Sequence, residues 1–361
     1  EVLEILDNCV SCKACKSECP SNVDMARYKA EFLQHHYDVC GVPLKALLVA
    51  NLSRIQRWGM YLPSLYNVFI SNPLTGGLLK KLLRFAPERS IPKLYKTTLR
   101  HWATRHRSCN KDTTRGKIYL FADEFTDYMD VRVGIRMIEL LSGLGYEVVI
   151  PEHVESGRTA LSKGLLKEAK KIARKNVVLL KDIVTDENPL VGIEPSCILS
   201  FRDEYPDLVG DDLKAEASSL GKNCLLYDEF IVREIRKGNI RSGQFTRKPL
   251  KILLHGHCHQ KSLASVEPSK IMLSLPENYE VEVIPSGCCG MAGAFGYEKK
   301  HYELSMKIGE QVLFPAIRNA DEGVCISAPG TSCRQQIKDG TGRTALHPIE
   351  VLFQAWQETE G

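Results

Sequence analysis

The sequence predicts an α/β fold, in which an N-terminal helical segment precedes a duplicated region with mainly parallel sheets. The main observation is that short apolar runs alternate with helical stretches, as in Ile118–Ala122, Val131–Leu144 and Val148–Ile150. Strands separated by helices are typical of parallel sheets. An internal repeat predicts the duplication, and a dense group of cysteines near the N-terminus marks the helical segment that precedes it.

Composition divides the 361 residues into four expected segments. Residues 1–40 form a helical segment that carries the first cysteines, and its second helix begins at a capping side chain within 22–24. Residues 41–112 form a helical, basic linker region. The two copies of the repeat occupy residues 113–248 and 249–361.

The basic linker region is expected to be helical at Pro43–Ile55, Leu78–Phe85 and Lys93–Arg107. Lysine and arginine greatly outnumber acidic residues in it. Such an excess is typical of a solvated face of packed helices. The alternative is a docking face for an acidic partner domain, or a peripheral contact with an anionic membrane surface.

The repeat is visible as matching segments. Lys117–Leu120 recurs as Lys251–Leu254, an offset of 134 residues (251 − 117 = 134), and Tyr146–Pro151 recurs as Tyr279–Pro285. Two copies imply two similar lobes whose loops meet between them. In addition to the runs above, one helix is expected at Leu161–Lys175, and strands at Val177–Leu180, Leu190–Ile193, Ile252–Leu254, Val281–Ile284 and Val324–Ser327.

The chain has 13 cysteines and a net charge of +4. It shows no secretion signal, and many of its cysteines lie too close together for disulfides, so metal ligation in a reducing compartment is expected. We therefore expect a cytoplasmic protein, or one peripheral to the inner membrane face. The small net charge gives no argument for nucleic acid. The missing initiator Met leads us to expect a piece of a longer chain.

The strongest motif is the run Cys9-x₂-Cys12-x₂-Cys15-x₃-Cys19-Pro20. Such spacing wraps a loop around an iron–sulfur cluster, and a zinc site is the weaker alternative. In runs of this type the fourth cysteine usually ligates a second cluster. Either Cys19 or a distant thiolate such as Cys40 completes the site, or a partner run precedes Glu1. Positive charge near the cluster is expected from Lys13 and Lys16.

A second set of cysteines lies in the second copy of the repeat. Cys258, the pair Cys288-Cys289, and Cys333 each follow a predicted strand. The carboxyl ends of parallel strands share one edge of a sheet, where sites are commonly built. Four thiolates there suffice for a cluster, and the flanking glycines allow close approach of the backbone.

In the first copy, Glu124 and Glu155-Ser156 replace these cysteines, and only Cys197 remains. Cys197 is a vestige, a buried small hydrophobic residue or an additional ligand. Arg202, Asp203 and Glu204 follow Cys197 and form either a site cluster or an exposed helix start, and we expect the exposed helix start. Cys109, Cys224 and Cys325 are expected to be plain buried thiols.

Three histidines surround Cys258, namely His255, His257 and His259. They either hydrogen-bond the turn or the cluster sulfurs, or they transfer protons to a reducible substrate or quinone.

With these residues in view, the chain resembles the CCG-domain iron–sulfur oxidoreductases. These include the iron–sulfur subunits of glycolate oxidase and anaerobic glycerol-3-phosphate dehydrogenase, a subunit of heterodisulfide reductase, and the C-terminal part of fused FAD-linked oxidases. The resemblance covers nearly the whole chain. It is carried by Cys9–Met25, Gly157–Gly164, Glu194–Glu204, His257–Gln260 and Gly287–Gly296.

The resemblance implies an electron path from a 2-hydroxy acid, such as D-lactate or D-2-hydroxyglutarate, through FAD and one or two 4Fe-4S clusters. The FAD is expected in an upstream domain and not in this chain. The acceptor is expected to be a quinone or a redox protein. These expectations make the chain the electron-transfer part of an FAD-linked 2-hydroxy-acid dehydrogenase.

One departure from the family pattern bears on these expectations. Relatives of the heterodisulfide reductase type end their site in Cys-x-x-Cys, whereas here Cys333 is followed by Gln336. A plain four-thiolate cluster is then as well supported as a noncubane one. Two other interpretations stay open: a thiol–disulfide or quinone reductase acting at the second cysteine set, and a zinc-stabilised scaffold.

Overall fold

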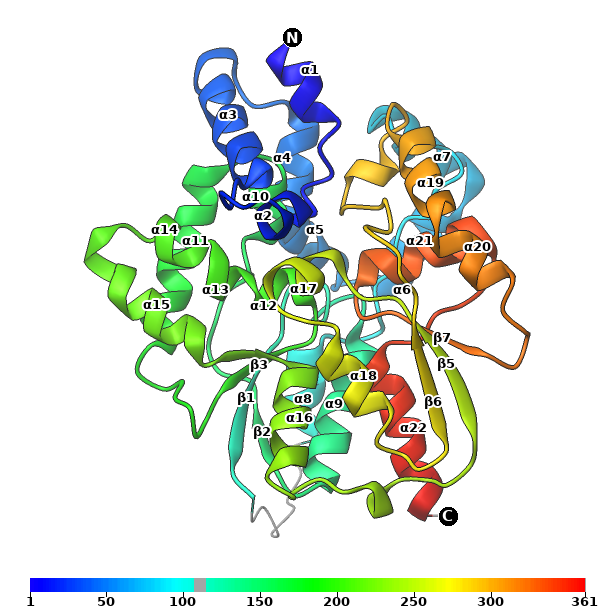
Figure 1. Cartoon of the computed structure of the whole chain (residues 1–361). Helices are drawn as coiled ribbons and strands as arrows, with labels where there is room; N and C mark the ends of the chain where they lie inside the picture. Colours follow the sequence, from blue (N-terminus) through cyan, green and yellow to red (C-terminus); the bar gives the residue numbers. More distant parts are fainter. Residues whose placement is uncertain (107–114, 361) are drawn as a thin grey trace.

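The computed structural model describes residues 1–106 and 115–360 (Figure 1). Cys109 lies outside the described residues, so its expected burial is not addressed. Up to residue 106 the elements are all helices. They are α1 (Val2–Asp7), α2 (Ala14–Glu18), α3 (Met25–Cys40), α4 (Leu44–Ala50), α5 (Leu52–Gly59), α6 (Pro63–Ser71), α7 (Pro73–Leu82) and α8 (Leu99–Arg105).

Two sheets, both entirely parallel, follow these helices, which confirms the predicted α/β fold. The first sheet has the strand order β2-β1-β3-β4 and the second has the order β6-β5-β7. The strands are β1 (Lys117–Phe121), β2 (Glu147–Val149), β3 (Leu190–Gly192), β4 (Cys224–Leu226), β5 (Leu250–Leu254), β6 (Tyr279–Val283) and β7 (Cys325–Ser327).

The first three strands of each sheet share one topology, and β4 extends the first sheet by a fourth strand. In each, the first strand pairs with the next strand along the chain on one side and with the third strand on the other. The segments that match in sequence, Lys117–Leu120 and Lys251–Leu254, form the central strands β1 and β5. The first three strands of the two copies are therefore in matching order. The division into four segments stays a prediction.

Helices cover both faces of each sheet. The helices of the duplicated region are α9 (Val131–Gly143), α10 (Arg158–Ser162), α11 (Leu166–Leu180), α12 (Pro195–Ile198), α13 (Ser200–Asp203), α14 (Tyr205–Leu208), α15 (Lys214–Lys222), α16 (Tyr227–Arg236), α17 (Cys258–Leu263), α18 (Glu267–Leu273), α19 (Tyr302–Gln311), α20 (Leu313–Arg318), α21 (Thr331–Thr341) and α22 (Pro348–Glu360). Among the described residues, three short 3₁₀ turns lie at Asp211–Leu213, Ser242–Gln244 and Phe295–Tyr297.

The main hydrophobic core lies between the two sheets. Leu120 and Val191 from the first sheet and Ile252 and Leu254 from the second belong to one buried cluster. Figure 1 shows α9, α16, α18 and α22 between the sheets, and their apolar faces fill this cluster. The carboxyl ends of both sets of strands consequently have fixed positions in one body.

Most expected elements occur within a few residues of their predicted bounds, but one predicted strand is wrong. Val177–Leu180 is the last turn of α11. The buried residues Ala173, Val177 and Leu180 continue the three- and four-residue spacing of a helix face. The expected helix at Pro43–Ile55 is divided into α4 and α5 at Asn51.

In the described part of the chain, no helix combines the length and the apolar character that crossing a membrane requires.

Candidate metal centre

The second cysteine set lies at the carboxyl edge of the second sheet. Cys258 begins α17 just after β5, and Cys333 lies in the first turn of α21, after β7. Cys288 and Cys289 lie in the loop that follows β6. Residues that are as many as 75 positions apart (333 − 258 = 75) therefore meet because parallel strands end at the same edge.

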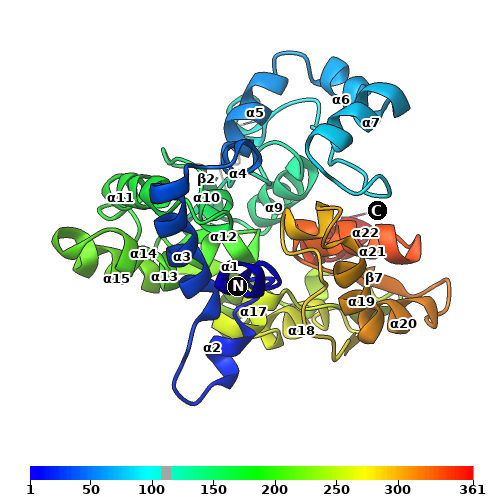
Figure 2. The same cartoon turned by 90° about the horizontal axis from the view of Figure 1, so that it is seen from above.

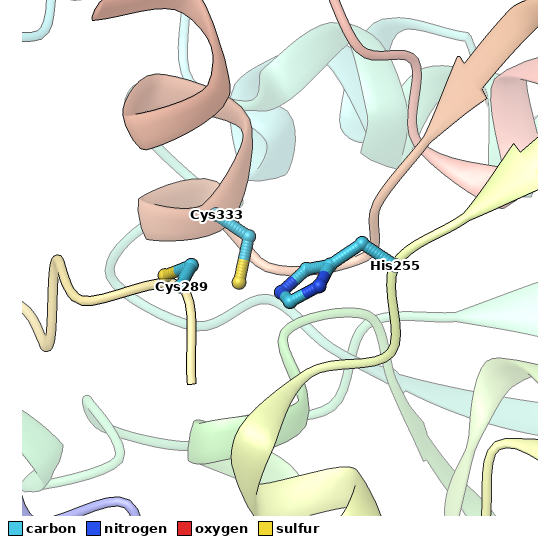
Figure 3. Close-up of side chains that lie close together, drawn as sticks. All are labelled: His255, Cys289 and Cys333. Carbon is cyan, nitrogen blue, oxygen red and sulfur yellow. The ribbon is translucent and has the colours of Figure 1, made fainter. Parts of the chain in front are cut away.

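The four thiols contact one another in a row. Cys258 is hydrogen-bonded to Cys288, Cys288 to Cys289, and Cys289 to Cys333. A ring nitrogen of His255 and the sulfurs of Cys289 and Cys333 all lie within 4.8 Å of one another (Figure 3). The structure thus brings together the four cysteines of this predicted site.

Burial keeps Cys289 and Cys333 out of water, whereas Cys258 and Cys288 are half-buried. Cys289 and Cys333 are 3% and 1% exposed. The hydrogen bond with Cys288, followed by burial, raises the pKa of the Cys258 thiol well above its usual value. The thiols are therefore neutral without a metal, and a metal that binds them must displace protons.

His255 offers a buried nitrogen without a partner. Its Nδ1 lies 2.8 Å from the Ser286 hydroxyl oxygen, and its Nε2 has no hydrogen-bond partner among the described residues. Burial lowers the pKa of His255 well below its usual value, so the imidazole is neutral. A neutral imidazole beside two thiols can accept a metal or hydrogen-bond a cluster sulfur.

The other two histidines serve the turn and the N-terminal segment. His257 Nδ1 accepts the His259 amide N–H at 3.1 Å and caps α17, and its Nε2 lies 3.6 Å from a carboxylate oxygen of Glu194. His259 Nε2 lies 3.0 Å from the Ser11 carbonyl oxygen.

The loop that carries Cys288 and Cys289 is held in place by close backbone contacts. Gly290 has φ +92, and a Cβ there would lie 2.3 Å from the Ser305 carbonyl oxygen. Arg89 supports the same loop: its Nε donates to the Gly296 carbonyl at 2.8 Å, and a second guanidinium nitrogen pairs with Asp339 at 2.9 Å. Sequence reasoning missed Arg89, because nothing local distinguishes it from the exposed cations around it.

The first cysteine run forms a second group at the molecule's N-terminal segment. The Cys12 thiol interacts electrostatically with the thiols of Cys9 and Cys15. Positive φ angles at Ser11 and Lys13 turn the loop around these sulfurs. The amides of Ser11 and Met25 donate to the sulfurs of Cys9 and Cys15, each at 3.4 Å.

Cys19 ends α2, and its backbone N–H donates to the Cys15 carbonyl oxygen at 3.0 Å. The thiol of Cys19 accepts hydrogen bonds from the backbone of Val23, Ser21 and Asn22, which lower its pKa. Cys40 is exposed at the end of α3. Which thiolate completes the first site stays a prediction.

The two cysteine groups are neighbours in space. Cys12 and Cys258 interact electrostatically, although they are 246 residues apart (258 − 12 = 246). The Ser262 hydroxyl donates to the Cys12 carbonyl at 3.3 Å, so α17 contacts the N-terminal loop directly. Each group can be identified from the sequence separately, but their contact depends on tertiary packing alone.

Buried ion pairs fix the N-terminal loop to the first lobe. The Lys13 side chain is 1% exposed and lies 3.1 Å from Asp24 and 2.9 Å from Glu204, and it also pairs with Asp203. Burial opposes the charge of Glu204, but Arg158 and Lys13 lower its pKa well below the usual value. The expectation that Asp203 and Glu204 are exposed was wrong, because the N-terminal segment covers them.

The first copy of the repeat holds a polar cluster in place of a thiol site. Ligand atoms of Asp123, Glu124 and Cys197 lie within 4.8 Å of one another, all buried. The Ser156 hydroxyl donates to Glu124 at 2.8 Å, and the Thr126 hydroxyl donates to Asp123 at 2.7 Å. Cys197 therefore lies with this hydrogen-bonded cluster, apart from the four thiols of the second copy. Cys224 is buried as expected, and Cys325 is half-buried.

The donors present fit an iron–sulfur cluster or a soft metal ion. At the second-sheet edge a ring nitrogen of His255 and the sulfurs of Cys289 and Cys333 lie together, and the thiols of Cys258 and Cys288 continue the row. Amide groups donate to cysteine sulfur at both groups, including Gly290 to Cys288 at 3.4 Å. Such N–H···S contacts are characteristic of cluster sites.

Comparison with known proteins agrees with this chemistry. Residues 252–338 match the family described as CCG, cysteine-rich domain. The chain is 28% identical to D-2-hydroxyglutarate dehydrogenase of Escherichia coli (strain K12) over 98% of its length, but it spans only 34% of that protein.

Two shorter proteins are also similar. One subunit of the anaerobic glycerol-3-phosphate dehydrogenase of Escherichia coli (strain K12) is 26% identical over 77% of the chain and 68% of that protein. Lactate utilization protein A of Exiguobacterium sp. is 28% identical over 68% of the chain and 97% of that protein. The chain therefore carries a CCG cysteine-rich domain and is related to oxidoreductases that include the D-2-hydroxyglutarate dehydrogenases.

Proposed function

We propose that this chain is the iron–sulfur electron-transfer module of a flavin-linked D-2-hydroxy-acid dehydrogenase. It would pass electrons from reduced FAD, bound outside this chain, to an acceptor such as a quinone or a redox protein. The observation that carries the proposal is that α17, which begins at Cys258, contacts the loop of the first cysteine run through the hydrogen bond from the Ser262 hydroxyl to the Cys12 carbonyl oxygen. The names of the relatives, a 2-hydroxyglutarate dehydrogenase among them, support the substrate class.

The residues divide into two sets of ligands. Cys258, Cys288, Cys289 and Cys333 would hold one 4Fe-4S cluster, and Cys9, Cys12 and Cys15 would hold the second together with Cys19 or another thiolate. When bound, such clusters accept and release single electrons. The thiols hold iron, and none is assigned a nucleophilic role.

The chain's own groups set the environment of these sulfurs. The amides of Ser11, Met25 and Gly290 donate to cysteine sulfur at 3.4 Å each. Hydrogen bonds to sulfur and burial are two of the features that set cluster potentials. His255 is positioned to donate or accept a hydrogen bond at the second group, according to its tautomer.

One observation favours a different occupant of the second group. His255, Cys289 and Cys333 form a mixed imidazole and thiol set, which also suits zinc. A zinc-stabilised scaffold is therefore the second candidate, and metal analysis separates it from the first. Chemistry on a thiol, disulfide or quinone substrate at this group is a further alternative, supported by turnover without a flavin partner.

The test is reduction of the anaerobically purified chain with dithionite, followed by visible and EPR spectroscopy. We expect the wild-type chain to show signals of two reduced clusters. Cys288→Ser should remove one signal and Cys12→Ser the other, because each substitution removes a ligand of one group. Cys325→Ser is the matched control, since Cys325 belongs to neither group, and it should leave both signals.

A chain that stays spectroscopically silent after reduction, or whose signals are lost equally in the control, would contradict the proposal.

A further inference from the structure

A large cavity opens beside the first cysteine group. Its volume is about 1450 Å³, and Cys9, Val10 and Ser11 form part of its wall. Helices α6 and α7 and the loop from Ala292 to His301 form other parts. Figure 2 shows α6 and α7 together at one side of the molecule, apart from the N-terminal helices.

The lining of this cavity is strongly cationic. Eight of the lining side chains are lysine or arginine, and only two, Asp7 and Glu298, are carboxylates. Both carboxylates already have partners. Glu298 pairs with Lys45 at 2.9 Å and with Lys163 at 3.0 Å, and His301 lies 3.0 Å from Asp7.

Five of the eight cations pair with no carboxylate among the described residues, and two of these, Lys29 and Lys80, donate to the backbone carbonyls of Cys9 and Pro87. Lys81, Arg84 and Lys299 are exposed, and within residues 1–106 and 115–360 no side-chain hydrogen bond or ion pair is found for them. Charges of one sign along the wall of a concavity concentrate their field in it and attract counter-charged partners. The cavity therefore attracts anions to the wall formed by Cys9.

The position of Cys9 gives this attraction a functional meaning. Cys9 is in the first cysteine group, so a redox centre held near the cavity wall would lie next to a bound cluster. Leu6 and Phe295 add apolar surface to the same lining. Apolar surface bordered by charge is suited to brief encounters between redox proteins, whose interfaces are small.

We propose that this cavity is the port through which the first cysteine group exchanges electrons with the acidic face of a partner redox protein. The inference rests on the proposed function and names the chemistry of the partner at that site. In each encounter one electron leaves the reduced iron–sulfur cluster and reduces the partner's flavin or metal centre. The transfer to a one-electron centre requires no proton.

Size favours a protein over a small molecule as the occupant. The cavity is larger than the roughly 300–1,000 Å³ that is usual for small ligands. Helices α6 and α7 also carry exposed apolar side chains outside it, with Phe69, Leu74 and Leu78 exposed by 47%, 83% and 69%. A protein surface can contact these side chains while an acidic segment enters the cavity.

Two inorganic oxidants of opposite charge test the port. The clusters are reduced with dithionite, and their reoxidation by tris(oxalato)cobaltate(III), a trianion, or tris(phenanthroline)cobalt(III), a trication, is followed by stopped-flow absorbance. We expect the double variant Lys81→Glu/Arg84→Glu to lower the rate of reoxidation by the trianion about tenfold at low ionic strength. The same variant should raise the rate of reoxidation by the trication. Added salt should remove the difference.

The control is Lys248→Glu/Lys251→Glu, which changes the net charge equally. Both lysines are exposed; Lys248 precedes β5 and Lys251 is its second residue, at the opposite end of the second sheet from the four cysteines of the site. If the control variant lowers the rate of reoxidation by the trianion as much as the cavity variant does, only the net charge matters and the proposal about the cavity is refuted. If the chain holds no iron, the proposed function fails and the port fails with it.

An anionic membrane is the competing occupant. A sedimentation assay tests this alternative by comparing binding of the chain to vesicles of phosphatidylglycerol with its binding to neutral phosphatidylcholine vesicles. We expect no binding that depends on Lys81 and Arg84. Co-sedimentation with the anionic vesicles that the cavity variant abolishes would assign the surface to lipid and overturn the proposal.

Discussion

Asp228 shows how a single buried side chain links the sequence to the site. It has no exposed surface and lies at the start of α16, where the Gln260 amide donates to its carboxylate at 2.7 Å and the Ser269 hydroxyl also donates to it. Gln260 is two residues from Cys258, so Asp228 supports the helix that presents this cysteine. Burial raises the pKa of Asp228 to about 7.

This raised pKa predicts a pH-dependent stability. The folded chain holds a proton on Asp228 that the unfolded chain releases near pH 4, so the stabilisation is complete below that pH and is lost as pH rises to about 7. We expect Asp228→Asn to gain about 2 kcal/mol of unfolding free energy over wild type between about pH 5.5 and pH 8. Urea denaturation at each pH measures it.

Asp182→Asn makes the same change of carboxylate to amide at an exposed position and should leave the pH profile unaltered. If the unfolding free energy of Asp228→Asn changes with pH in parallel with that of the wild type, the raised pKa is wrongly assigned to Asp228.

Lys13 is the second residue whose burial predicts a measurable effect. Three carboxylates surround its ammonium group, and removing the group leaves them buried without their cation. We expect Lys13→Met to lower the unfolding free energy by about 3 kcal/mol. The side chain of Lys16 is 27% exposed, and Lys16→Met is expected to cost less than about 1 kcal/mol. Equal losses would show that the ion pairs of Lys13 contribute no more than a surface pair.

At the scale of elements, the loop after β6 decides whether two cysteines reach the site. Glycines flank the Cys288-Cys289 pair on both sides, and the structure gives them different roles. Gly290 combines φ +92 with backbone packed against its Cα, whereas a Cβ at Gly287 would have no neighbour within 4 Å. Only Gly290 needs to be glycine.

We therefore expect Gly290→Ala to displace the loop and to lower the iron bound at this group by more than about half, while Gly287→Ala retains it. Iron analysis of both purified variants, with circular dichroism to confirm that each is folded, is the measurement. Loss of iron in both variants, or in neither, would contradict the role given to the Gly290 backbone.

At the scale of the whole molecule, the contact between the two cysteine groups predicts magnetic interaction. Because α17, which begins at Cys258, contacts the loop that carries Cys12, two reduced clusters would lie close enough for their spins to couple. We expect the EPR spectrum of the fully reduced chain to be broader than the sum of the spectra of Cys12→Ser and Cys288→Ser. A wild-type spectrum equal to that sum would place the clusters too far apart to interact.

Local patterns in the sequence predict much of this molecule. The parallel sheets follow from apolar runs between helices, and the meeting of Cys258, Cys289 and Cys333 follows from the rule that parallel strands end at one edge. The helical end of α11 was missed because Val177–Leu180 is short and β-branched, and only its burial pattern identifies the helix.

Long-range packing could not be predicted. The ion pair between Lys13 and Glu204 joins residues 191 positions apart (204 − 13 = 191), and the support of the cysteine loop by Arg89 is equally distant in sequence. The cationic cavity draws residues from five separate segments, so the excess of lysine and arginine in the linker region favoured a solvated face and left a docking face as the alternative.

The central claim is that this chain holds two iron–sulfur clusters side by side. The most direct test is the content of iron, acid-labile sulfide and zinc in the chain purified without oxygen. We expect about eight iron and about eight sulfide per chain, with zinc absent. Stoichiometric zinc without iron would contradict the claim and would make the cysteine groups structural zinc sites.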